Sequence, residues 1–494
     1  MEYRKYNIDR NIYNMYSRDS DMDSKESEVQ QLRPENALIY TRPSNVALVD
    51  RRVFKTYNFS NNSYELGSTM QIIVNSGGDA VWGRSSYIRL QYTTGGSMDF
   101  GTGSILNIFK SIRLTHRSGE VLEYVDNVNL VANLTRFWHY SVDDRRKLDG
   151  MLNNDTLSNT AANSYTNVQD DGVHVACIPM SILCGLFNSE NQYMPATLCA
   201  GMKIELELAP LTAISTQPSN PTAALMTIAD MKPTLVLDTA QLYDVINKQL
   251  LEEQAQVDRS GIQFSYFTYF NSFQVIPAGV TSVNFDIQQS ASLVHKILVA
   301  VRDNRKLTTN VPGNVGVDKY TTIAPFNTAQ FRLGSLYMPQ QVVSVPPVNA
   351  IAPNWDDIQL NSKEWFNYGL VAHMAAVDEF HKSAGGSASI TYQEYTTSAN
   401  VPDGNQWISG KAVYAFTGEK SAVSLMLTGE PTNNSRLLNF NAQIFSLIGA
   451  GGAYPATNQV APAYYNIDAG LRVDYYLQYL RCANLMGDNC VVDR

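Results

Sequence analysis

The chain has 494 residues, of which 44% are hydrophobic and 17% are charged, and its formal net charge is −9. A single hydrophobic core rarely serves more than about 250–300 residues, so this length predicts two domains. The acidic balance and the lack of a basic block argue against a nucleic-acid-binding surface as the main role.

The first residues show no sustained apolar period. Residues 1–34 carry charges of both signs, which predicts an extended or disordered arm. The tyrosines near Met1 would let this arm dock on a partner, and a terminus that contacts nothing is an equal alternative. We expect the arm to span residues 1–45, with no secretory signal, and no apolar run in the chain predicts a membrane-spanning helix.

Short alternating runs separated by turn residues follow, and each predicts a β-strand. In the first half they are Val53–Tyr57, Met70–Val74, Tyr87–Tyr92, Ile108–Leu114, Val121–Tyr124 and Val173–Cys177. Asp126–Tyr140 changes to a helical period and predicts a helix. Residues 141–171 are polar and predict a long surface loop, in which Asp143–Lys147 is a solvated run of charges.

The stretch Ile178–Leu208 combines three predicted elements. Pro179 is expected at the first position of a short apolar helix, where its missing N–H is tolerated. A loop containing Pro195 follows, and Met202–Leu208 then alternates strictly as a half-buried strand. Glu205 and Glu207 lie on one face of that strand, which indicates an outer surface rather than an acid–base pair.

Leu242, Val245, Ile246 and Leu250 predict a helix that links the two halves, over residues 239–260. The second half then repeats the outline of the first, with alternating runs, a helix at Ser362–Val377, a polar loop and more runs. These runs are Ile262–Phe270, Val283–Ile287, Val294–Val301, Phe331–Tyr337, Val413–Phe416, Ala422–Leu427, Asn439–Leu447 and Val473–Tyr479. Phe264–Phe270 is aromatic on both faces, which fits a strand packed against another sandwich or subunit, or one buried within its own domain.

The pattern therefore predicts an all-β protein with short inserted helices and two β-sandwiches in series. The boundaries we expect are residues 1–45 for the arm, 46–238 for the first sandwich, 239–260 for the linker helix, 261–482 for the second sandwich and 483–494 for a C-terminal tail.

The search for chemistry yields no catalytic, cofactor-binding or metal-binding residues. His373, Asp378, Glu379 and His381 form the nearest cluster of metal-ligand types, and a solvated helix end is the preferred interpretation. Asp303 beside Arg302 and Arg305 predicts a charged turn. The five cysteines contain no CxxC pair and are expected as buried thiols of a protein made in a reducing compartment.

The stretch Ile178–Leu208 resembles a segment of the double jelly-roll major capsid proteins of nucleocytoplasmic large DNA viruses, virophages and Polinton-like viruses. The matching positions are Ile178-Pro179, Leu186-Phe187, Pro195 and Ile204–Leu208, whereas Met180 stands where the family usually has leucine. Phe109–Asn133, the helix after Leu237-Asp238, Phe331–Pro339 and the helix at 364–376 resemble further parts of these proteins, so that the resemblance covers residues 45–480.

The resemblance implies two consecutive eight-stranded jelly rolls and a viral major capsid protein without enzymatic activity or cofactor. Such a protein would form a pseudo-hexagonal homotrimeric capsomer that tiles an icosahedral shell around double-stranded DNA. The implied partners are neighbouring capsomers, penton and minor capsid proteins and an inner membrane where one is present, without sequence-specific nucleic-acid binding. The implied location is the virion, after synthesis in the host cell interior, with loops 141–171, 305–325 and 381–410 forming outer towers.

Two other classes of function remain open from the sequence. The first is a minor capsid protein, penton or glycan-binding adhesin built from β-sandwiches, and the second is a two-domain β-sandwich hydrolase. The similar halves, each with its own helix, disfavour the first, and the lack of a catalytic motif disfavours the second.

Overall fold

The computed structural model describes 19 segments of the chain. They are residues 49–95, 98–99, 105–138, 142–153, 168–169, 172–188, 193–210, 214, 227–243, 262–277, 280, 282–287, 294–303, 326–333, 335–344, 414–417, 438–444, 471–486 and 489–493. The chain divides into two compact units, Met1–Asp50 and Arg51–Arg494. Apart from the first two residues of β1, everything described below belongs to the second unit.

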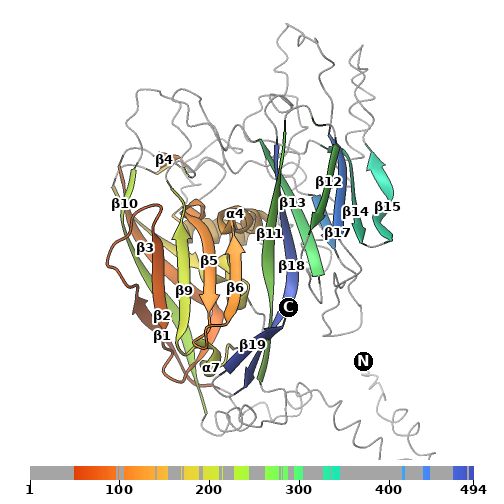
Figure 1. Ribbon diagram of the computed structural model, residues 1–494. Coiled ribbons are helices and arrows are strands. Elements are labelled where there is room, and N and C mark those ends of the chain that lie inside the picture. Colours follow the sequence, from red (N-terminus) through yellow and green to blue (C-terminus); the bar gives the residue numbers. More distant parts are fainter. Residues whose placement is uncertain are drawn as a thin grey trace, which may run out of the picture. The chain divides into compact units, whose positions relative to one another are not determined.

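The first half forms two four-stranded antiparallel sheets (Figure 1). One has the order β1-β10-β3-β8 and the other β2-β9-β5-β6. Their strands are β1 (Val49–Asn58), β2 (Thr69–Val74), β3 (Ala80–Gly95), β5 (Phe109–Thr115), β6 (Val121–Asp126), β8 (Gly172–Pro179), β9 (Met202–Leu208) and β10 (Thr227–Leu242). Two short strands, β4 (Met98–Asp99) and β7 (Val168–Gln169), pair only with each other.

The second half repeats this topology with β11-β18-β13-β16 and β12-β17-β14-β15. Its strands are β11 (Ile262–Ile276), β12 (Ser282–Ile287), β13 (Val294–Asp303), β14 (Phe326–Leu333), β15 (Leu336–Ser344), β16 (Tyr414–Thr417), β17 (Leu438–Ile444) and β18 (Leu471–Met486). Counted along the chain, the eight main strands of each half lie in the orders 1-8-3-6 and 2-7-4-5. Each half is therefore a jelly roll, which confirms the predicted fold class.

Two hydrophobic clusters fill the rolls. The first core includes Met70, Ile88, Ile112 and Leu206, and the second core includes Ile297, Phe440 and Tyr475. In β9 the predicted alternation is confirmed, because Met202, Ile204, Leu206 and Leu208 are buried and the residues between them are partly exposed. Glu205 and Glu207 do lie on that outer face, in ion pairs with Lys203 and Lys110 respectively.

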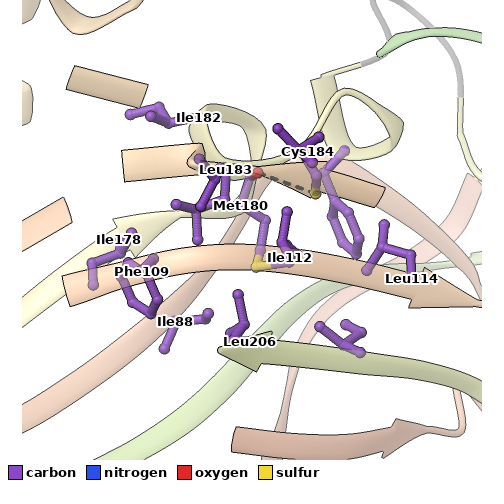
Figure 2. Packing of buried hydrophobic residues seen from close by; sticks show 14 of the residues in the cluster. Ile88, Phe109, Ile112, Leu114, Ile178, Met180, Ile182, Leu183, Cys184 and Leu206 are labelled. Carbon is purple, nitrogen blue, oxygen red and sulfur yellow. Dashed lines mark hydrogen bonds between the residues drawn. The ribbon is translucent and has the colours of Figure 1, made fainter. Parts of the chain in front are cut away.

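Short helices pack against the first roll. Of these, Val128–Trp138 and Met180–Leu183 were predicted, whereas Ala196–Cys199 was expected as a loop. The short helices are η1 (Ile105–Ile108), α4 (Val128–Trp138), α6 (Met180–Leu183), η2 (Leu186–Asn188) and α7 (Ala196–Cys199). In Figure 2 the side chain of Met180 reaches from α6 toward Ile112 of β5. The expected position of Pro179 is wrong by one residue, because Pro179 is the extended N-cap of α6 (φ −60°, ψ 130°) and closes strand β8.

Three other expectations are corrected. The predicted loop 141–171 contains helix α5 (Val142–Met151), which is anchored by the buried Leu148 and, just after it, Leu152. Strand β10 continues to Leu242, so the first four residues of the predicted linker helix are strand, paired through Thr239 and Ala240 to β3. The expected tail 483–494 largely belongs to the sheet, because β18 reaches Met486 and β19 (Asn489–Asp493) pairs with it.

Several predicted segments lie outside the described residues: the arm, most of the linker helix, the helix at 362–377 and the loops 305–325 and 381–410. All five cysteines are free thiols, of which Cys184, Cys199 and Cys490 are buried. In the described part of the chain, no helix is both long and apolar enough to cross a membrane.

Candidate functional site

The contact between the two rolls carries the most unusual chemistry in the described residues. In β6, Leu122 and Glu123 are consecutive and both fully buried. Consecutive residues of a strand point to opposite faces, so a strand with one solvent-exposed face would expose one of these two side chains. Both faces of β6 are therefore covered here, although Tyr124, the next residue along, is 52% exposed.

The Glu123 carboxylate accepts three hydrogen bonds from two separate parts of the chain. The backbone N–H groups of Gly185 and Leu186 donate at 2.8 and 2.9 Å, and Thr268 Oγ1 of β11 donates at 2.6 Å. Burial raises the pKa of Glu123, whereas these three donors and the nearby Arg481 act to lower it. The carboxylate therefore joins β6, the segment between α6 and η2, and the second roll.

Leu122 offers its carbonyl oxygen to two further side chains of the second roll. Arg481 of β18 donates to it at 2.7 Å through Nη1, and to the Val121 carbonyl at 3.3 Å through Nη2. The Tyr266 hydroxyl donates to the same Leu122 oxygen. Tyr266 and Arg481 face each other in the β11–β18 register, so one cross-strand pair of the second roll binds the edge strand of the first.

Gly185 lets the backbones of the two rolls approach closely. A Cβ atom at this position would lie 1.5 Å from the carbonyl oxygen of Phe267 in β11 and 3.3 Å from the Glu123 carboxylate. β11 is an outer strand of its sheet, and the segment at Gly185 lies against it. This contact covers an edge that would otherwise present unpaired backbone groups.

A second polar contact lies where β6 leads into α4. Asn127 has a left-handed backbone (φ 48°), which asparagine adopts more readily than most residues. Its carbonyl accepts a hydrogen bond from the Tyr476 hydroxyl at 3.0 Å, and its Nδ2 donates to Asn271 Oδ1 at 3.1 Å. Tyr476 and Asn271 face each other in the β11–β18 register.

Apolar packing between the rolls is continuous with the first core. In β13 and β18, Leu298, Ala300 and Tyr476 belong to the first core, although their neighbours Ile297, Val299, Val301, Tyr475 and Leu477 belong to the second. Phe264 and Tyr266 of β11 also belong to the first core. The sequence left two alternatives for the aromatic run, and the structure shows that Phe264 and Tyr266 pack against the first roll of the same chain.

The expected charged turn at Arg302-Asp303 is wrong. β13 runs through to Asp303, and Arg302 is buried in an ion pair with Asp474 of β18. Arg302 donates to Asp474 Oδ2 from Nε at 3.1 Å and from Nη2 at 2.7 Å, and Arg472 donates to Oδ1 of the same carboxylate. Each oxygen of this fully buried carboxylate therefore accepts a hydrogen bond from an arginine.

The other candidate site residues form no second site. His373, Asp378, Glu379 and His381 lie outside the described residues. Within the described part of the chain, no group of three or more His, Cys, Asp or Glu residues could hold a metal ion. The polar contact at Glu123 and the close approach at Gly185 were missed from sequence, and their clearest signals there are the glutamate within Val121–Val125 and the glycine within the apolar run Ile182–Phe187.

Two jelly rolls in one chain, joined by a buried contact, define a double jelly-roll protein. No protein-family model and no curated protein matches the sequence. Solved structures do match over most of the chain. The capsid of the virus PBCV-1 is similar at a TM-score of 0.58 and 11% identity, covering 92% of this chain and 99% of the other.

Two further structures support the same fold. The Faustovirus major capsid protein has a TM-score of 0.54 and 7% identity, covering 90% of this chain and 92% of its own. The Sputnik virophage structure has a TM-score of 0.53 and 10% identity, covering 92% and 90%. The likeness is one of fold, and it confirms the double jelly-roll fold implied by the sequence resemblance.

Proposed function

We propose that this chain is a viral major capsid protein that self-assembles into a pseudo-hexagonal homotrimeric capsomer. The observation that carries the proposal is the repeated 1-8-3-6 and 2-7-4-5 topology within one chain. Three copies would place six similar rolls around a common axis, which gives near-hexagonal symmetry from a trimer. Such units would tile an icosahedral shell around a double-stranded DNA genome.

The buried contact between the rolls supports this role by fixing their relative orientation. A building block repeated many times in a shell needs one geometry, since a small rotation between its rolls would be copied into every contact. The hydrogen bonds of Glu123, Arg481 and Tyr266 cross from one roll to the other and are directional. We assign this contact a structural role rather than a catalytic one.

The remaining parts of the chain receive roles within the same proposal. Residues 1–45 form an arm at the base of the capsomer, where it binds neighbouring capsomers, penton or minor capsid proteins, or an inner membrane where one is present. The rolls span about residues 46–242 and 261–493, and the protein resides in the virion after synthesis in the host cell interior.

Native mass spectrometry of the purified protein tests this function. The full chain is expected at three times its mass of 54.9 kDa. A variant that lacks residues 1–34 is expected to keep the trimer mass and to lose shell formation, measured by light scattering under assembly conditions. A monomer at micromolar concentration for the full chain contradicts the proposal. A monomer for the shortened chain alone contradicts the role of the arm.

A further inference from the structure

The last strand of the chain adds its buried residues to the first core. β19 pairs with the end of β18, from Met486 opposite Asn489 to Cys482 opposite Asp493. Its residues alternate, with Val491 47% exposed, and Cys490 and Val492 buried. This alternation is that of a strand with one face against a protein surface.

The buried face of β19 belongs to the first core. Cys490 and Val492 join that cluster together with Ala483 and Leu485 of β18, whereas the odd-numbered residues Val473–Tyr479 of β18 join the second core. Burial raises the pKa of Cys490 to about 11, with a further contribution from Glu120, which precedes β6.

Arg481, in the adjoining part of β18, binds the first residues of β6. Its guanidinium donates to the carbonyls of Val121 and Leu122, which are 360 and 359 residues away in the sequence. Figure 1 shows β19 turning from the end of β18 toward the strands of the first roll. The end of β18 thus binds strand β6 through Arg481, and the buried residues of β19 belong to the same core as Leu122 of β6.

We propose that β19 is a C-terminal strap that completes the first core and fixes the two rolls as one unit. A chain without the strap still forms the strands of both rolls, but β6 opens more often and the orientation of the rolls is no longer fixed. Assembly then depends on a complete C-terminus. The link to assembly rests on the proposed capsid function, whereas the link to β6 does not.

Hydrogen exchange measured by mass spectrometry tests the strap on the full chain and three variants. Deletion of residues 487–494 and the substitution Val492→Asp are each expected to speed exchange in β6 roughly tenfold or more, because they remove apolar burial from the first core. Val491→Asp is the matched control, since its side chain is exposed on the same strand, and it should leave exchange in β6 unchanged. Strand β17, in the second core, serves as the internal reference.

Unchanged exchange in β6 after the deletion overturns the strap. If a variant does not fold, Val492→Ala replaces it, and faster exchange in β6 but not in β17 is still required. The native mass of the full chain separates the two proposals. If the full chain is a monomer but the deletion speeds exchange in β6, the capsid function is contradicted and the strap is supported. If the full chain is a trimer and the deletion leaves exchange in β6 unchanged, the strap is contradicted and the capsid function is supported.

Discussion

Replacing Gly185 with alanine is expected to lower the free energy of unfolding by about 3 kcal/mol, at the upper end of the usual range for overpacking. The added Cβ would overlap the carbonyl oxygen of Phe267. That oxygen belongs to the backbone of β11 and cannot rotate away as a side chain would. The rolls must therefore move apart, which also lengthens the hydrogen bond from Thr268 to Glu123. Urea unfolding followed by circular dichroism measures the change.

Gly150→Ala is the matched control for this substitution. Gly150 lies in helix α5, and a Cβ there would meet nothing within 4 Å. Alanine is favoured over glycine in a helix by about 1 kcal/mol, so this variant should be as stable as the original chain or slightly more so. Equal stability of the two variants would mean that the backbones at Gly185 and Phe267 are not in close contact.

Glu123→Gln is expected to cost about 3 kcal/mol of unfolding free energy, the lower end of the range for breaking a buried charge interaction. The amide has nearly the same shape, but its NH₂ group faces a hydrogen-bond donor whichever way it turns. One orientation meets the N–H of Leu186, and the other meets the N–H of Gly185 and the Thr268 hydroxyl. Arg481 also loses its nearby negative charge.

The control for this change is Glu207→Gln on the outer face of β9. Glu207 pairs with Lys110 in an ion pair whose side chains are 39% and 47% exposed, so its loss should change stability by less than about 1 kcal/mol. A double-mutant cycle of Glu123→Gln with Thr268→Val then measures coupling between the rolls. Strictly additive effects would contradict a shared hydrogen bond across the contact.

The strands were predictable because their signal is local. Met202–Leu208 alternates residue by residue, and the structure buries the same four positions that the pattern indicates. The helix at Val128–Trp138 was predicted for the same reason, from apolar residues at helical spacing. The alternating pattern does not say which strands pair with each other. The jelly-roll order was expected only because Ile178–Leu208 resembles a segment of the capsid proteins.

The polar contacts between the rolls could not be predicted because their partners are far apart in sequence. Thr268 lies 145 residues from Glu123, and Arg481 lies 359 residues from Leu122. A charged residue met without its partner is normally expected in solvent, which is why Arg302-Asp303 suggested a turn. The tail assignment failed similarly, because β19 is short and its buried residues belong to a core formed mostly by distant parts of the chain.

Negative-stain electron microscopy of the purified full chain tests the central claim most directly. We expect particles with a hexagonal outline whose class averages show threefold symmetry, since each of three chains contributes two similar but not identical rolls. Particles with one or two lobes and no hexagonal outline in any class would contradict it.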